Sequence, residues 1–194
     1  MKKIFLDCGT HLCEGLKQFY NKKIINNDFE IHTFEANPEC FIDERIKSLP
    51  FDVIPHKKAV WIKDGTIMFN QENHRKSHSG SPSDGKSNID GWGSSIDGIG
   101  FVHPGYEMKV EVECISFSNF LNQFDDNDEI ICKMDIEGSE FEVLRDMLKN
   151  GSIKKIKDLY VEFHERFMPN ENENTKNSLV TEIKLQGVNV YTWF

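Results

Sequence analysis

The sequence has 194 residues, of which 38% are hydrophobic and 28% charged, and its formal net charge is −9. This composition is typical of a globular chain, and the length fits one domain, so residues 1–194 are taken as a single domain. The acidic balance argues against a nucleic-acid groove or an anionic membrane surface as the main partner. No segment reaches the roughly 18 consecutive apolar residues of a membrane-spanning helix.

The cysteines indicate a reducing compartment. There are five, an odd number, and none of them forms a Cys-x-x-Cys pair. Such a set is typical of reduced, structural thiols. The chain starts Met1-Lys2-Lys3 and enters a predicted strand at once, without the apolar segment and cleavage site of a signal peptide. We therefore expect a cytoplasmic protein.

Strands and helices alternate in the first part of the chain. Apolar segments predict strands at residues 3–8, 29–34 and 51–60. Helical spacing of apolar residues predicts one helix over residues 12–20, and Asn37-Pro38 has the form of an N-cap followed by proline at the first helical position, opening a helix that runs to Ile46. Asp64-Gly65 predicts a tight hairpin turn.

The composition changes at residues 71–100, where Gly, Ser, Asn, Asp and His dominate. Loops of this length inside a domain usually serve a function or are disordered. We interpret the segment as a mobile lid with Trp92 as its anchor, and we expect contacts with the substrate from residues 77–100.

The second part of the chain again alternates. In chain order, the patterns predict a half-exposed strand at 110–114, a helix at 117–124, a buried parallel strand at 129–132, a helix from Ser139 to Asn150, a strand at 157–164, a polar loop at 166–177, a last helix around 179–183 and a final strand at 188–194. Ser139 and Glu142 have the spacing of a capping box. The alternation predicts a doubly wound α/β fold with a mostly parallel sheet.

Acidic residues follow three of these strands. Asp7 precedes the Gly9 turn, Glu35 ends the second strand, and Asp135 and Glu137 follow the strand at 129–132. Open α/β sheets bind ligands at the carboxyl ends of their strands, and a fixed carboxylate there can accept both hydroxyls of a ribose. Each position taken alone also fits a plain turn or a solvated acid, but together they favour a nucleoside ligand.

Four motifs carry a resemblance to a known family. They are Asp7-Cys8-Gly9, Phe34-Glu35-Ala36-Asn37-Pro38, Lys133-Met134-Asp135-Ile136-Glu137-Gly138 and Val161-Glu162-Phe163-His164. In this order and spacing the chain resembles the FkbM-type S-adenosylmethionine-dependent methyltransferases over nearly its whole length. The resemblance implies the Rossmann-like class I methyltransferase sheet, and O-methylation of sugars and related small metabolites that carry hydroxyl groups.

The resemblance also implies roles for individual residues. The cofactor-binding residues would be Asp7, Gly9, Thr10, Glu35, Ala36, Asn37, Ala59 and Val60, with Glu35 on the ribose and Ala59 and Val60 beside the adenine. The residues near the methyl-transfer centre would be Asp135, Glu137 and His164.

The chain departs from the family pattern in several places. Thr10, His11 and Cys13 replace the usual Ala-Asn-x-Gly after the first glycine, and no helices precede the first strand, so this would be a minimal version of the fold. Only one strand follows the last helix. An unpaired sheet edge is a site for association, which favours a homo-oligomer.

The chemistry leaves alternatives open. Asp135, Glu137 or His164 could act as the base for the acceptor hydroxyl, or the carboxylates could hold Mg²⁺ or Mn²⁺. A second hypothesis is methylation of an RNA or cap 2′-hydroxyl, with Lys133, Asp135 and Glu162 resembling part of a Lys-Asp-Lys-Glu tetrad. A third is a methyltransferase-like module that binds a partner without catalysis.

Overall fold

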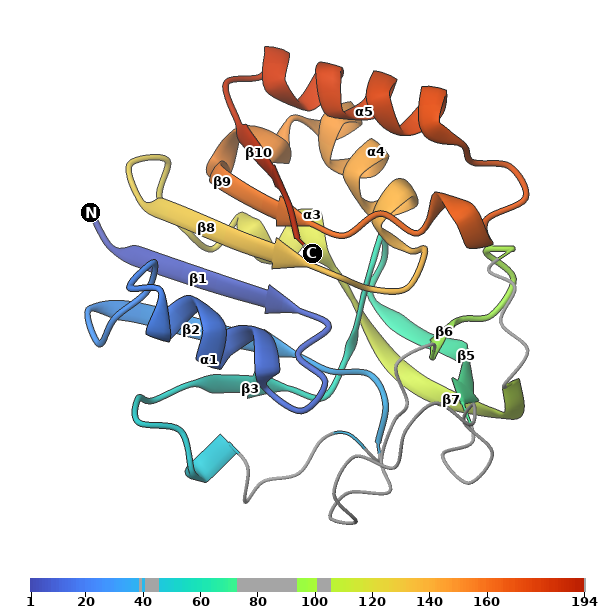
Figure 1. Cartoon of the computed structure of the whole chain (residues 1–194), viewed down its shortest axis with the longest axis horizontal. Coiled ribbons are helices and arrows are strands. Elements are labelled where there is room, and N and C mark those ends of the chain that lie inside the picture. Colours follow the sequence, from blue (N-terminus) through green and yellow to red (C-terminus); the bar gives the residue numbers. More distant parts are fainter. Residues whose placement is uncertain (39, 41–45, 73–93, 101–105, 194) are drawn as a thin grey trace.

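The computed structural model describes residues 1–38, 40, 46–72, 94–100 and 106–193, and it confirms the α/β class (Figure 1). Six strands form one sheet in which every neighbouring pair is parallel. Their order across the sheet is β10 (Asn189–Thr192), β9 (Ile156–Val161), β8 (Glu129–Met134), β1 (Lys3–Cys8), β2 (Phe29–Phe34) and β3 (Ile54–His56). The final strand, β10, lies at one edge of this sheet. That an unpaired edge there leads to a homo-oligomer stays a prediction.

Helices cover both faces of this sheet because alternate side chains of its central strands point to opposite sides. Phe5 of β1 packs with α1 (Glu14–Asn21), whereas Ile4 and Leu6 pack with α4 (Glu140–Asn150) and α5 (Glu173–Leu185). The helix α3 (Phe117–Leu121) shares the latter face, and short 3₁₀ turns lie at Ser152–Lys155 and Glu165–Phe167. The doubly wound arrangement predicted from the alternation is therefore confirmed.

A second, smaller sheet packs beside the first, and the sequence did not predict it. It contains β4 (Ala59–Trp61), β7 (Tyr106–Ser116), β5 (Gly65–Glu72) and β6 (Ser95–Ile96), in that order. Phe69, Ile96 and Val112 of this sheet belong to the same hydrophobic core as α4 and α5. In Figure 1 this separate sheet lies beside the carboxyl ends of the parallel strands.

Two predictions about residues 51–66 are wrong. The predicted strand at 51–60 is two short strands in two different sheets, β3 and β4, separated by Lys57 and Lys58. The Asp64-Gly65 turn does not close a hairpin, because β7 inserts between β4 and β5. Asp64 instead accepts a hydrogen bond from the Ser116 backbone N–H at 3.1 Å, which holds the turn against the end of β7.

The predicted capping box of α4 is also wrong. Ser139 occupies the N-cap with helical dihedral angles, and its side chain makes no capping hydrogen bond. The carboxylate of Glu140 accepts the Gly138 backbone N–H at 2.8 Å instead. The predicted polar loop at 166–177 includes the start of α5, whose N-cap Asn172 forms a capping box with Thr175.

Several predictions concern residues outside the described ones. The helix expected to open at Asn37-Pro38 falls mostly on residues 39 and 41–45, and most of the predicted lid, with Trp92, falls on residues 73–93. Within the described part of the chain, no helix has the length and apolar character needed to cross a membrane.

Candidate active site

The strand order creates a crevice beside β1. Because β1 lies between β2 and β8, the connections that follow β1 and β8 diverge at their carboxyl ends, which is where such sheets bind ligands. A cavity of about 630 Å³ lies there. Its lining includes most of the residues predicted from sequence, namely Gly9, Thr10, Glu35, Ala36, Ala59, Val60, Asp135, Glu137 and His164.

On the β2 side, Glu35 is held by the backbone. One carboxylate oxygen accepts the His11 N–H at 2.7 Å and the other accepts the Asn37 N–H at 2.7 Å. Burial raises the pKa of Glu35, and these two hydrogen bonds partly offset that rise by stabilising the charged form. The carboxylate therefore has a fixed orientation while it lines the cavity, and each oxygen keeps a lone pair for a further donor.

The turn after β1 packs directly on the turn after β8. Gly9 has φ +79°, and a Cβ built there would lie 1.8 Å from the carbonyl oxygen of Asp135. The Asp135 N–H also donates to the Cys8 carbonyl at 3.1 Å. Only glycine fits this position, because both the dihedral angle and the close approach exclude a side chain.

Asp7 does not line the cavity, although the sequence analysis assigned it to the cofactor. Its side chain is fully buried, and one oxygen lies 3.4 Å from the Lys133 ammonium. Lys133 also lies 3.4 Å from Asp135 and donates to the Gly9 carbonyl at 2.6 Å. Asp7 therefore neutralises the lysine that connects the two turns.

The charges of Asp7, Lys133 and Asp135 alter the pKa values of Asp7 and Lys133. Burial raises the pKa of Asp7, and the Lys133 charge partly offsets that rise. Burial lowers the pKa of Lys133, but the charges of Asp7 and Asp135 outweigh this and raise it above its ordinary value. Lys133 is thus a fixed positive charge beneath the site.

Asn37 also lies away from the cavity lining. Its buried side chain accepts a hydrogen bond from Gln71 at 3.1 Å and donates to the Ser94 hydroxyl at 3.3 Å. Gln71 belongs to β5, and Ser94 immediately precedes β6. Asn37 therefore connects the turn after β2 to the second sheet, which contributes Phe69 and Ile96 to the cavity.

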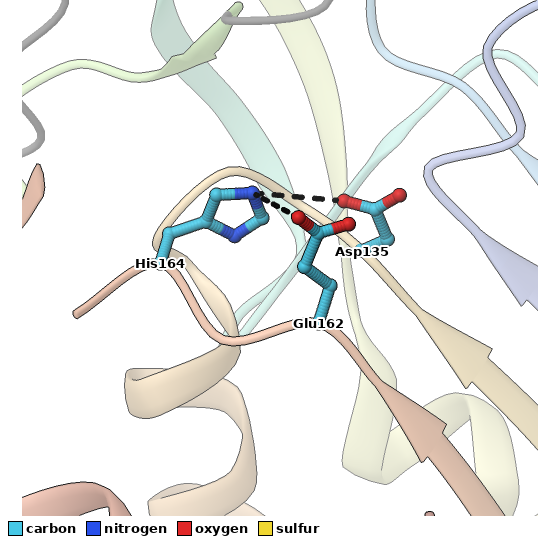
Figure 2. A group of neighbouring side chains, drawn as sticks. All are labelled: Asp135, Glu162 and His164. Atoms are coloured by element: carbon cyan, nitrogen blue, oxygen red, sulfur yellow. Dashed lines mark ion pairs between the residues drawn. The ribbon is translucent and has the colours of Figure 1, made fainter. Parts of the chain in front are cut away.

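On the opposite side, three potential ligand groups converge. Asp135 follows β8, whereas Glu162 and His164 follow β9, and Figure 2 shows the imidazole facing both carboxylates. His164 Nε2 lies 3.9 Å from Asp135 Oδ1 and 3.8 Å from Glu162 Oε1. The Glu162 N–H donates to the Met134 carbonyl at 3.0 Å. The pairing of β8 with β9 therefore continues as far as the residues that carry these side chains.

Glu140 orients the imidazole. Its side chain is fully buried, and Oε1 accepts the His164 backbone N–H at 2.8 Å and lies 3.0 Å from Nδ1. A proton on Nδ1 can be donated to Glu140, and Nε2 then faces the cavity. Nothing in the sequence indicates this role, because an acid in the first turn of a helix is usually a solvated partner of the helix dipole.

Glu137 completes the acidic side of the cavity. Its backbone adopts the left-handed conformation with φ +53°, a strained state for a residue with a side chain, and Oε2 lies 3.4 Å from His164 Nε2. Burial raises the pKa of Glu137 to about 8, because the opposing charge of His164 does not offset burial and the nearby acids. Burial also raises the pKa of Glu162, with the charge of Asp135 adding to the effect.

The acidic neighbours also raise the pKa of His164, whereas burial acts on it in the opposite direction. Burial lowers its pKa, but the hydrogen bond to Glu140 and the charges of Glu140, Glu137 and Asp135 outweigh burial and raise it to about 9. Strongly displaced pKa values inside a cleft, such as those of Glu137 and His164, are typical of sites that transfer protons or hold charged ligands.

Comparisons with known proteins agree with this architecture. A family model described as the Methyltransferase FkbM domain matches residues 7–184. The fold is similar to a crystal structure of Methyltransferase FkbM from Methylobacillus flagellatus KT, with a TM-score of 0.50 and 15% sequence identity, over 93% of this chain and 37% of that chain. A search of curated proteins finds no match. Because the family model covers nearly the whole sequence, the chain belongs to the FkbM methyltransferase family.

Proposed function

We propose that the protein is an S-adenosylmethionine-dependent O-methyltransferase that acts on a hydroxyl group of a sugar or related small metabolite. Membership of the family supports methyl transfer. The cofactor and the hydroxyl acceptor rest on the chemistry of the cavity and on the resemblance described above. This chain spans only 37% of the structural neighbour, so the activity of a longer protein is not carried over.

The residues on the β2 side fit an adenosyl group. The Glu35 carboxylate is fixed by two backbone N–H groups and borders the cavity, so its remaining lone pairs can accept hydrogen bonds from both ribose hydroxyls. Ala59 and Val60 add apolar surface suited to a purine. The volume of about 630 Å³ lies within the usual range for a small-molecule site.

The residues on the β8 and β9 side fit the reacting groups. When bound, S-adenosylmethionine supplies a methyl group: the acceptor oxygen forms the new C–O bond as the S–C bond breaks, and that electron pair stays on sulfur. The chain must place the acceptor oxygen within roughly 3–3.5 Å of the methyl carbon. It must also receive the hydroxyl proton, for which the Asp135 carboxylate is the candidate, with Glu137 and His164 beside it.

One observation carries this proposal. Glu35 and the Asp135–His164 group come from distant parts of the sequence, yet they line opposite sides of one cavity at the switch point of the sheet. A nucleoside-binding acid and a proton-accepting group within a single cavity are the two requirements of methyl transfer from an adenosyl sulfonium to a hydroxyl.

The test is a calorimetric titration of the protein with S-adenosylmethionine and S-adenosylhomocysteine. We expect saturable binding of both, and we expect Glu35→Ala to weaken it by roughly 10–100-fold because hydrogen bonds to a charged group are lost. The matched control is Glu30→Ala in β2, the strand that Glu35 follows, since Glu30 pairs with Lys2 and His32 outside the cavity.

Screening of sugar acceptors by mass for a gain of one methyl group then tests the reaction. Binding without any methylated product across sugars and small hydroxylated metabolites would contradict the proposed acceptor. Absence of binding would contradict the cofactor and would favour the non-catalytic module. An affinity equal in the Glu35 and Glu30 variants would contradict the ribose assignment.

A further inference from the structure

We propose that Asp135, Glu162 and His164 bind one divalent cation, with Mn²⁺ the preferred ion, on the acceptor side of the cavity. The site itself follows from the geometry of these side chains. Its role in activating the acceptor hydroxyl rests on the proposed function, and the experiment below separates the two.

The three groups have the spacing of ligands around one ion. Their ligand atoms all lie within 4.8 Å of one another, and Nε2 is 3.9 and 3.8 Å from the two carboxylate oxygens. These separations are too long for hydrogen bonds. They match the separation between ligands that each lie roughly 2.0–2.4 Å from a shared ion.

Glu140 provides the outer contact that such a histidine requires. Its buried carboxylate lies 3.0 Å from Nδ1 and also accepts the backbone N–H of the same residue at 2.8 Å. With the proton on Nδ1, Nε2 faces three carboxylates, of which Glu137 is the nearest at 3.4 Å, so a cation would replace the ion pairs that Nε2 makes with them. A carboxylate behind a ligating imidazole fixes the tautomer and increases the basicity of the ligand.

The local charge favours a cation. Asp135, Glu137, Glu140 and Glu162 surround a single imidazole, and Lys133 lies on the other side of Asp135, 3.4 Å from Oδ2. Asp135 Oδ1 is the oxygen that faces His164. A divalent ion between Oδ1, Glu162 and Nε2 would offset charge that Lys133 and Arg166 offset only in part.

An independent feature of the cavity also indicates a polar ligand. Ser139 lines it, is 1% exposed, and its hydroxyl has no hydrogen-bond partner among the described residues. Buried hydroxyl groups in folded proteins nearly always have a partner. The hydroxyl oxygen is closed to water in this conformation, so a change of the Ser139 rotamer would be needed for water held by a cation to provide one.

The ligand types favour Mn²⁺. Carboxylates suit Mg²⁺, Ca²⁺ and Mn²⁺, whereas an imidazole is a poor ligand for the first two and a good one for transition metals. Three protein ligands leave coordination positions open for the acceptor oxygen. A cation there would lower the pKa of that hydroxyl and so ease its deprotonation.

The experiment is a titration of the metal-stripped full chain with Mn²⁺ alone, in which the free ion is followed by electron paramagnetic resonance. We expect one saturable site per chain. Asp135→Asn and Glu162→Gln should each weaken binding at least tenfold, and Glu140→Gln should weaken it by roughly 10–100-fold through the orientation of the ring.

The matched control is Glu142→Gln, which removes an exposed carboxylate from the same helix as Glu140 and should leave Mn²⁺ binding unchanged. Near-ultraviolet circular dichroism in EDTA checks that each variant is folded. No saturable binding up to millimolar Mn²⁺, equal affinity in the wild type and both ligand variants, or an equal loss in the Glu142 control would overturn the site.

Calorimetry with S-adenosylhomocysteine in EDTA separates this inference from the proposed function. Binding of the nucleoside without Mn²⁺ binding overturns only the cation site. Saturable Mn²⁺ binding that depends on Asp135, without nucleoside binding, supports the site and contradicts the proposed function.

Discussion

The two sides of the cavity use acids at the ends of parallel strands in different ways. After β2, Glu35 has a backbone N–H on each oxygen, so the fold itself fixes its direction. After β8 and β9, Asp135 and Glu162 face an imidazole at 3.9 and 3.8 Å, beyond hydrogen-bond distance. An acid fixed by backbone groups is suited to binding, whereas acids that face one another and a histidine are suited to chemistry.

The largest expected effect comes from the chemical side. Asp135→Asn keeps the shape of the side chain but removes a charge from the cluster, and we expect kcat to fall by roughly 10²–10⁴-fold. The affinity for S-adenosylhomocysteine should change much less than in Glu35→Ala. Turnover measured by mass, together with calorimetry on both variants, checks this split. Full turnover in the Asp135 variant would remove the distinction between the two sides.

A smaller effect is expected where the two sides meet. Gly9→Ala places a Cβ 1.8 Å from the Asp135 carbonyl oxygen at φ +79°. The matched control is Gly151→Ala, which has φ +83° but no atom within 4 Å of the new Cβ. Both variants carry the backbone strain, and the clash should cost Gly9→Ala about 1–3 kcal/mol more. Urea unfolding measures the difference, and equal losses would show that the two turns can separate freely.

The smallest effect concerns a histidine beyond the cavity on the β2 side. His56 of β3 stacks on Phe34 and lies 3.0 Å from His32. Burial lowers its pKa to about 4, with the charges of His32 and Lys58 adding to the effect. This is the reverse of His164, whose pKa its acidic neighbours raise.

Because the unfolded chain binds this proton more readily than the folded one, neutral His56 contributes stability fully above pH 6.5. That contribution is lost as the pH falls from 6.5 toward 4. The free energy of urea unfolding should therefore fall more steeply over this range in the wild type than in His56→Gln. Equal pH dependence in the wild type and the variant would mean that the pKa of His56 is not lowered in the folded protein.

Local patterns were sufficient for most of the parallel sheet, and the family resemblance implied most of the cavity lining. Buried apolar segments and helical spacing predicted the strands β1, β2, β8 and β9, and the acids at their ends were assigned to one crevice. The same patterns failed at Asp64-Gly65, where the turn signal is real but β7, about forty residues later in the sequence, separates the strands that it connects. Pairing of strands so far apart is not encoded in a local dipeptide.

The sequence by itself determined that acids follow the strands of an α/β sheet, because strand periodicity and strand ends are local properties of the chain. Only the tertiary structure decided what each acid does. Asp7, which looks like a ligand contact in sequence, is fully buried against Lys133, and Glu140, which looks like an ordinary helix-start residue, orients His164. The reason is electrostatic: the state of a carboxylate depends on the charges and N–H groups within a few ångströms, and distant segments of the chain supply them.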